Sequence, residues 1–230
     1  MKTLLLKLKG PMQSYGTSSH FETRQTDYYP SKSAIIGIIA ASFGYKRDND
    51  EKINQLNNLD FAVRIDQEGV LSRDFHTASK YKKNGKLERN YVTNRYYMED
   101  AVYVVAISHK DEDFIDKIRH ALSNPYYQPF MGRRSCPIPA DFIIKSTNVG
   151  PIEALEKLEW QASDWYKRKH KNYIADIYAD KGLIDNNSLI KRNDSVISFS
   201  QKNRKFGPRF EARDSKLMSY SDDIDFFEHI

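Results

Sequence analysis

AVYVVAISHKDEDFIDKIRHAL, residues 101–122, is the stretch of sequence that decides the fold. Residues 101–108 are apolar and rich in β-branched side chains, which is typical of a strand in the centre of a sheet. Residues 113–122 predict an amphipathic helix, because helical spacing places five apolar side chains on one face: Phe114, Ile115, Ile118, Ala121 and Leu122. The stretch therefore predicts a central strand followed by a helix.

The chain on either side of this stretch extends the alternation of strands and helices. The other predicted strands are residues 3–9, 61–66 and 141–146. Residues 34–43 predict a helix that Ser31 or Ser33 can cap and that ends at Gly44. The order of elements is βαββαβ, which is the ferredoxin-like pattern that RNA-recognition motifs also use. We therefore predict an α+β fold with a ferredoxin-like (RRM-like) core.

A β-hairpin is predicted within this core at about residues 70–97, with arms at 70–77 and 90–97 around Asn84-Gly85. Residues 71–96 hold seven basic and two acidic residues, so this segment carries the entire net charge of +5. Its aromatic residues are Phe75, Tyr81, Tyr91 and Tyr96. Single-stranded nucleic acid suits such a segment, because cations follow phosphates and each base stacked on an aromatic ring contributes about 1–3 kcal/mol. A solvated hairpin is the alternative.

Residues 130–137, FMGRRSCP, form a second basic motif. Gly132 and Pro137 predict a bend, because one residue has a free φ angle and the other a fixed one. Arg133 and Arg134 present two guanidinium groups, each of which can give a phosphate two parallel hydrogen bonds. The alternative is a surface turn whose arginines pair with nearby carboxylates.

The sequence pattern is weaker after Pro151. Residues 152–166 favour a helix, residues 172–178 and 195–200 favour strands, and residues 204–213 are basic and aromatic. We predict a domain at residues 1–150 and an irregular C-terminal extension at 151–230 that packs on it.

Composition restricts the class of protein. The single cysteine, Cys136, excludes an internal disulfide framework and a cysteine-rich zinc site, and it fits a reducing compartment. The longest apolar run, residues 34–41, is too short to span a bilayer. We predict a cytoplasmic protein without membrane contact, metal or cofactor.

Several peptides together resemble the CasD family, the Cas-five subunit of the type I-E CRISPR surveillance complex Cascade. The matching peptides are residues 8–16 (LKGPMQSYG), 24–26 (RQT), 30–37 (PSKSAIIG), 61–64 (FAVR), 74–77 (DFHT), 93–100 and 132–137 (GRRSCP). Each peptide is weakly specific, whereas their order and spacing are specific together.

The resemblance implies a ferredoxin-like fold whose hairpin is a thumb that wedges against CRISPR RNA near the junction of handle and spacer. It implies an RNA-binding subunit that caps the 5′ handle and starts assembly of the backbone subunits for antiviral defence. The implied partners are CRISPR RNA, the backbone and large subunits of Cascade, and target DNA through the complex alone. The family usually has tryptophan where this chain has Tyr15.

The residues and the resemblance together give a predicted RNA-binding site. Lys32 follows Ser31 at a helix N-terminus, where exposed amides and the helix dipole attract a phosphate. The predicted contacts are Met12, Gln13, Ser14, Tyr15, Arg24, Ser31, Lys32, Ser33, His76, Thr77, Lys80, Lys82, Arg95, Gly132, Arg133, Arg134 and Ser135. Arg64, Arg209 and Arg213 are further candidates, the last two for RNA or a neighbouring subunit.

Two other functions stay open. A cousin branch of the family cleaves precursor CRISPR RNA without metal, which requires a base, a proton donor and a cation; here His20 and His76 are the histidines closest to the presumed RNA surface. A structural adaptor, whose basic hairpin docks on an acidic protein, is the other alternative. Carboxylate-based metal catalysis is less favoured, because Asp222, Asp223, Asp225 and Glu228 form an acidic tail. We therefore predict no catalytic residues.

Overall fold

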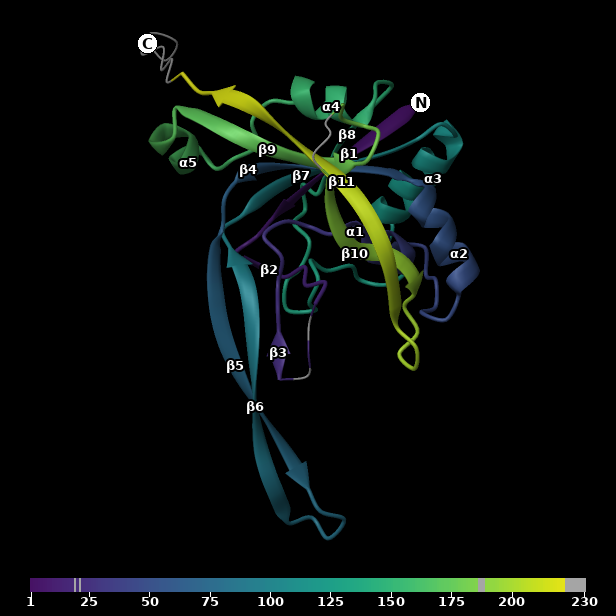
Figure 1. The fold of residues 1–230 in the computed structure, drawn as a ribbon, viewed down its shortest axis with the longest axis vertical. Helices are drawn as coiled ribbons and strands as arrows, with labels where there is room; N and C mark the ends of the chain where they lie inside the picture. The colour runs from purple at the N-terminus through teal and green to yellow at the C-terminus, as the bar shows by residue number, and fades with distance from the viewer. Residues whose placement is uncertain (19, 21, 186–188, 222–230) are drawn as a thin grey trace.

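The protein has an α+β fold built on two β-sheets (Figure 1). A computed structural model describes residues 1–18, 20, 22–185 and 189–221. The strands are β1 (Lys2–Lys9), β2 (Met12–Gln13), β3 (Thr23–Arg24), β4 (Asp60–Gln67), β5 (Val70–Tyr81), β6 (Leu87–Glu99), β7 (Val102–His109), β8 (Ile143–Thr147), β9 (Asn172–Asp180), β10 (Leu189–Ser198) and β11 (Lys205–Ser219). The helices are α1 (Lys32–Ser42), α2 (Asp50–Gln55), η1 (Leu56–Asn58), α3 (Glu112–Ser123), α4 (Pro151–Lys157) and α5 (Asp164–Lys169).

The larger sheet is antiparallel and has the strand order β10-β11-β9-β4-β7-β1-β8. Its central strands are buried on both faces, which explains the continuous apolar run predicted for β7. Leu4, Leu6 and Leu8 of β1 pack in the same core as α1 and α3. Leu5, whose side chain points to the other face, packs with α4. Strands β1, β4, β7 and β8, with α1 and α3, follow the predicted βαββαβ order along the chain.

The two predicted helices of the core are confirmed. Ser31 caps α1 by accepting a hydrogen bond from the Ala34 amide, and Gly44 follows the helix with a φ angle of 75°. Asp111 caps α3 in the same way through the Phe114 amide. No helix among the described residues is long and apolar enough to cross a membrane.

The prediction of an irregular C-terminal region is wrong. Strands β9, β10 and β11 extend the larger sheet, and β9 pairs directly with β4, so the sheet continues across residue 150. The predicted helix at 152–166 is two short helices, α4 and α5. The predicted strands at 172–178 and 195–200 correspond to β9 and to the end of β10. Charged residues obscured the first part of β10 and all of β11 in the sequence, because Asp194 and Glu211 are buried and each pairs with Arg209.

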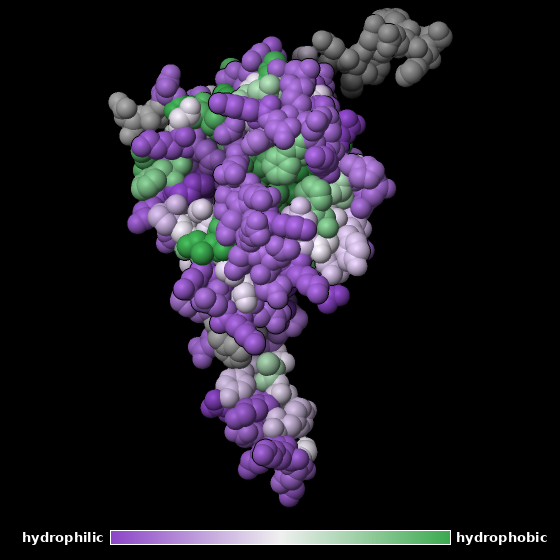
Figure 2. All heavy atoms as spheres, turned by 90° about the vertical axis from the view of Figure 1, so that its right-hand side faces the viewer, coloured by the Kyte–Doolittle hydropathy of each residue, from purple (hydrophilic) through white to green (hydrophobic). Residues whose placement is uncertain are grey.

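The thumb, β5 and β6, projects far from the sheet (Figure 1). The two strands pair from Val70↔Glu99 to Tyr81↔Leu87, so both arms are longer than predicted. Gly85 occupies the turn with a φ angle of 79°. The short strands β2 and β3 pair with β6 near its root. Figure 2 shows that the thumb is predominantly hydrophilic, which is expected of a hairpin that no other element covers.

Candidate nucleic-acid interface

Three arginines from distant segments meet at the root of the thumb. Arg24 of β3 lies opposite Arg95 of β6 in the paired strands. Arg133 donates a hydrogen bond from Nη2 to the carbonyl oxygen of Arg24, at 2.8 Å. Its guanidinium lies over the ring of Tyr97, 4.3 Å from the ring centre. We call Arg24, Arg95 and Arg133 the arginine cluster.

The charge of the arginine cluster is not neutralised within the part of the chain that the structure describes. None of its three guanidinium groups has an ion-pair partner there. Asp74 lies opposite Arg95 in the hairpin register, but its carboxylate is 3.2 Å from Nε2 of His76. Arg95 Nε and Arg133 Nη1 are buried without a described hydrogen-bond partner. Guanidinium groups without a carboxylate partner fit an anionic oxygen, such as that of a phosphate.

Gly132 holds the loop of residues 130–137 against β2. Its φ angle is +80°, and a Cβ atom at this position would lie 1.5 Å from the carbonyl oxygen of Ser14. The amide of Ser14 donates to the carbonyl of Met131 at 3.3 Å, and the Met131 amide donates to the Cys136 carbonyl at 2.8 Å. The predicted bend at Gly132 is therefore confirmed, and it carries Arg133 to Arg24. Arg134 and Ser135 are exposed on the same loop.

The predicted contact between bases and the side chains of residues 12–15 is corrected by the structure. Tyr15 is only 2% exposed, its ring packs edge-on against Tyr103, and its hydroxyl donates to Gln13 Oε1 at 2.7 Å. Gln13 Nε2 donates to the Ala101 carbonyl, and Ser14 Oγ donates to the Tyr96 carbonyl. These side chains fasten β2 to the thumb, so no ring face of Tyr15 is free to stack on a base. Met12 is partly buried.

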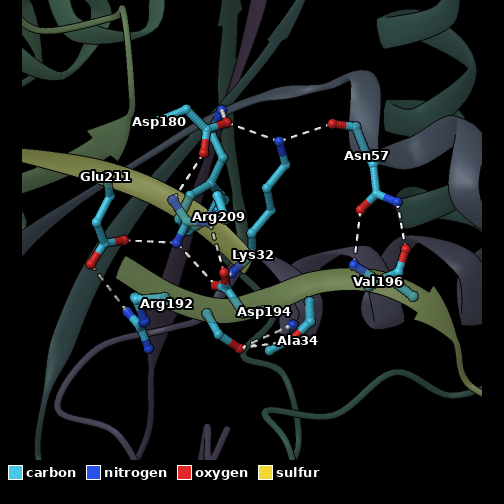
Figure 3. Close-up of polar contacts among 12 residues, drawn as sticks. Lys32, Ala34, Asn57, Asp180, Arg192, Asp194, Val196, Arg209 and Glu211 are labelled. Carbon is cyan, nitrogen blue, oxygen red and sulfur yellow. Dashed lines mark hydrogen bonds and ion pairs between the residues drawn. The ribbon is translucent and has the colours of Figure 1, made fainter. Parts of the chain in front are cut away.

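The predicted phosphate contact of Lys32 is also corrected. Lys32 is 7% exposed, and its Nζ donates to Asp180 Oδ2 at 2.8 Å and to the Asn57 carbonyl at 2.9 Å (Figure 3). The anion at the N-terminus of α1 is Asp194 of the same chain, whose Oδ2 accepts from the Lys32 amide at 2.9 Å. Ser31 is a buried cap whose Oγ lies 3.1 Å from that of Ser33. The sequence thus predicted an anion site but not its occupant.

Arg209, a predicted contact of the tail, belongs to the same buried charge cluster. Its guanidinium donates to Asp194, Asp180 and Glu211 over distances of 2.7–2.9 Å (Figure 3). These bonds connect β9, β10 and β11 to the start of α1. Arg209 is therefore a structural residue, and the exposed Arg213 pairs with Asp176.

The buried charge cluster predicts acid sensitivity. Burial alone would raise the pKa of Asp194, but hydrogen bonds from Arg209 and its positive charge outweigh this effect, so the pKa is lowered. An aspartate whose pKa is lower in the folded state than in the unfolded state stabilises the fold at pH values above its unfolded-state pKa, about 3.9. That stabilisation is lost as the pH falls through the folded-state pKa. We expect urea unfolding between pH 7 and pH 3 to show a shallower acid dependence for Asp194→Asn than for the exposed control Asp116→Asn. Equal acid dependence in both variants would contradict this assignment.

The two faces of the thumb differ in chemistry. Successive side chains of a strand point to opposite faces, so the register places His76, Lys80, Arg89 and Arg95 on one face. That face is cationic and leads to the arginine cluster, although Lys80 pairs with Glu88 at 2.9 Å. The opposite face carries the predicted contact Thr77, the exposed cation Arg73 and uncharged side chains that include Phe75, Val92 and Asn94. Lys82 lies in the turn at the tip.

Sequence reasoning missed Arg47 as a neighbour of this surface. Burial lowers the pKa of Arg204, and the positive charges of Arg47 and Arg24 lower it further, so both cations lie within electrostatic range of Arg204. The basic and aromatic composition of residues 204–213 was the feature of the sequence that could have identified Arg204 as part of this surface. The sequence carried no signal for Arg47, because only the fold brings it into electrostatic range of Arg204.

The model of the Cas_Cas5d family, described as "CRISPR-associated protein (Cas_Cas5)", matches residues 3–210. The chain belongs to this Cas5 family. The Escherichia coli (strain K12) protein "CRISPR system Cascade subunit CasD" is 31% identical over 182 residues, which cover 72% of this chain and 81% of that protein.

Two solved structures resemble this Cas5-family chain closely. A chain from "CRISPR RNA-guided surveillance complex" has a TM-score of 0.78 at 29% identity, covering 94% of this chain and 91% of that one. A chain from "Crystal structure of Cas protein" has a TM-score of 0.65 at 26% identity, covering 94% and 95% of the two chains. The α+β fold is therefore shared with known Cas proteins.

The two candidate histidines of this Cas5-family chain both lie near the pairing of β3 with β6. His20 donates its amide to the Thr23 carbonyl, Thr23 pairs with Asn94, and His76 pairs with the adjacent Thr93. No hydrogen bond or ion pair joins the two histidines within the described chain. The described residues also contain no group of His, Cys, Asp or Glu side chains that could hold a metal ion. The acidic tail at residues 222–228 lies outside the described residues.

Proposed function

We propose that this Cas5-family chain is a non-catalytic, cytoplasmic RNA-binding subunit of a type I-E CRISPR surveillance complex. It caps the 5′ handle of CRISPR RNA and nucleates assembly of the backbone subunits, and it meets target DNA only through the complex. The relative named as a Cascade subunit and the similar chain from an RNA-guided complex support this proposal.

The observation that carries the proposal is the unneutralised arginine cluster at the root of a cationic thumb. Phosphates of the handle bind Arg24, Arg95 and Arg133, whose guanidinium groups provide paired donors. The cationic thumb face, with His76, Lys80 and Arg95, bends the strand, and the exposed Arg134 adds charge at the loop.

The ferredoxin-like core at residues 1–150 serves as a platform in this proposal, with residues 151–230 as an extension packed on it. An RNA-recognition motif binds bases on the sheet face that its helices leave open. Here α4 covers that face, because Leu155 packs on Leu5, Val104 and Ala106. RNA therefore binds at the root of the thumb instead of on the sheet.

We expect the double variant Arg24→Gln, Arg133→Gln to bind handle RNA about 100- to 10,000-fold more weakly, since two charge-assisted hydrogen bonds contribute about 1.5–3 kcal/mol each. The slope of log K against log salt should fall by about 1.4, because each phosphate contact of a single strand contributes about 0.7. Fluorescence anisotropy across a salt series measures both effects.

The matched control removes two exposed cations of α3, as Lys117→Gln with Arg119→Gln. An equal loss of affinity in the control would show that net charge, and not the arginine cluster, determines binding. Failure of the wild-type chain to bind either handle RNA or scrambled RNA would favour the adaptor function.

The alternative function is metal-independent cleavage of precursor CRISPR RNA, for which His20 and His76, near one strand junction, are the candidate residues. Repeat RNA incubated with the protein and a metal chelator distinguishes the two functions. Intact RNA supports the clamp. Cutting at the handle boundary that His20→Ala or His76→Ala abolishes would establish the processing enzyme.

A further inference from the structure

A hollow of about 610 Å³ lies between the end of β1 and the start of α5. Residues 159–165, 167 and 168 form one wall, and Lys7 and Lys9 of β1 form another. Lys7 and Lys9 share the face of β1 that carries Leu5, so the hollow opens on the side of the sheet opposite α1 and α3. We call it the β1–α5 groove.

The lining of the β1–α5 groove is cationic. Its basic residues are Lys7, Lys9, Lys167 and Arg168, against the acidic Glu159 and Asp164. Lys7 pairs with Asp141, whereas the other three cations have no ion-pair partner among the residues described. Lys169 and Lys171 continue the basic run beyond the groove.

The two tryptophans of the chain have different roles at this groove. Trp160 is buried, donates from Nε1 to the Asp66 carbonyl at 2.6 Å, and stacks on Tyr173. Trp165 is 52% exposed and contacts Tyr166 edge-on, with ring centres 5.5 Å apart. Because its neighbour meets it at 83°, the broad face of the Trp165 indole is not stacked on Tyr166. An exposed aromatic ring among cations has the chemistry of a stacking site for single-stranded nucleic acid.

The wall of the groove is held in place by β4. The Gln161 amide donates to Asp66 Oδ2 at 2.6 Å, and Arg64 Nη1 donates to the Leu158 carbonyl at 2.9 Å. Both Arg64 and Asp66 are fully buried. These hydrogen bonds hold the backbone just before Trp165 in one position. Less chain therefore has to become ordered when a ligand binds, which lowers the entropic cost of binding.

The groove lies at the same end of the sheet as the thumb. Lys9 pairs with Val102, the first residue of β7, which directly follows the thumb strand β6. Two residues after Lys9, the Pro11 carbonyl accepts from the Asp100 amide at the root of the thumb. In Figure 1, α5 and the root of the thumb both lie at the left of the view, with α5 at the level of the sheet and the thumb extending below it.

We propose that the β1–α5 groove is a second binding site for single-stranded nucleic acid, read without sequence preference. The phosphates of the bound strand contact Lys9, Lys167 and Arg168, and one of its unpaired bases stacks on Trp165. A single strand fits the groove better than two other ligands. A duplex has no unpaired base to stack on the indole of Trp165, and an acidic protein would use the cations but leave the indole without a role. The groove shares no residue with the arginine cluster, so this site does not depend on the proposed handle binding.

The test uses the full chain carrying Arg24→Gln and Arg133→Gln, so that binding at the thumb does not mask the groove. Fluorescence anisotropy follows labelled oligouridine RNA and oligothymidine DNA of about twelve nucleotides, within the range of known single-strand sites. Trp165→Ala should weaken binding at least about fivefold, the equivalent of one lost stack. Lys167→Glu with Arg168→Glu should weaken it at least about tenfold and reduce the salt slope by about 1.4.

The controls separate stacking and local charge from general effects. Trp165→Phe retains a stacking face and should retain most of the affinity, and Lys117→Glu with Arg119→Glu on α3 should leave it unchanged. Binding of RNA alone, or of DNA alone, would identify which strand occupies the groove. Groove variants that bind like their parent, or an α3 control that weakens binding equally, would overturn the proposal. Thermal melting verifies that each variant is folded. If Trp165→Ala is unstable, the variant Lys167→Glu with Arg168→Glu still tests whether the groove binds nucleic acid.

Discussion

Replacing Gly132 with alanine is expected to disrupt the root of the thumb and to abolish tight handle binding. The new Cβ would lie 1.5 Å from the Ser14 carbonyl oxygen at a φ angle of +80°, so the backbone itself has to move. The strained backbone and the overpacking each cost about 1–3 kcal/mol, which gives a loss of about 2–6 kcal/mol in unfolding free energy. Movement of the loop also withdraws Arg133 from Arg24, so the arginine cluster separates.

Urea unfolding and handle-RNA anisotropy measure the two consequences. Gly182→Ala is the matched control, because Gly182 has a φ angle of +91° and a Cβ atom added there would meet nothing within 4 Å. The control retains the backbone strain without the collision. If Gly132→Ala were no more damaging than Gly182→Ala, the close approach of Gly132 to Ser14 would not determine the site.

Arg64→Ala is expected to destabilise the chain by about 3–5 kcal/mol, because it removes one partner of a fully buried ion pair. Arg64 is 0% exposed and donates to both carboxylate oxygens of Asp66, at 2.6 and 2.8 Å. It also donates to the carbonyls of Leu155, Leu158 and Glu159 at the end of α4. The variant leaves a buried carboxylate without its counter-charge and three carbonyls without their donor.

Urea unfolding measures this loss, with the exposed Lys145→Ala as control. The double variant Arg64→Met, Asp66→Leu should recover part of the stability, because it removes both charges from the interior. Folded Arg64→Ala should retain the salt slope of handle binding, since Arg64 faces α4 and not the thumb. A loss below about 1 kcal/mol, the range of a surface ion pair, would contradict the buried role. The sequence had offered Arg64 as an RNA contact, and the structure corrects this.

Local patterns in the sequence predicted the elements of the core. The apolar run of β7, the cap at Ser31 and the helical spacing of α3 each depend on residues close together in the chain. The thumb followed from a turn dipeptide and a concentration of charge, and its long arms pair as predicted around that turn. The bend at Gly132 was equally local. These predictions succeeded because backbone conformation and side-chain direction are largely set over a few residues.

The first part of β10 and the whole of β11 were not predictable in this way. Their buried positions include Arg209, Asp194 and Glu211, which a periodicity argument treats as solvent-exposed. Burial of these charges is tolerated because Arg209 pairs with Asp194 on the neighbouring strand and with Glu211 on its own strand, and pairing offsets the cost of desolvation. The pattern of hydrophobic residues along a strand cannot predict buried ion pairs of this kind.

The sequence by itself determined where the cations concentrate and which segments fold into the core and the thumb. Only the tertiary structure decided which cations are free to bind a phosphate. Lys32 and Arg209 are neutralised by carboxylates, and the partner of Lys32, Asp180, lies 148 residues away in the chain. Arg24, Arg95 and Arg133 meet without such a partner among the described residues. Ion pairing depends on distance in space, and the fold sets that distance independently of separation along the chain.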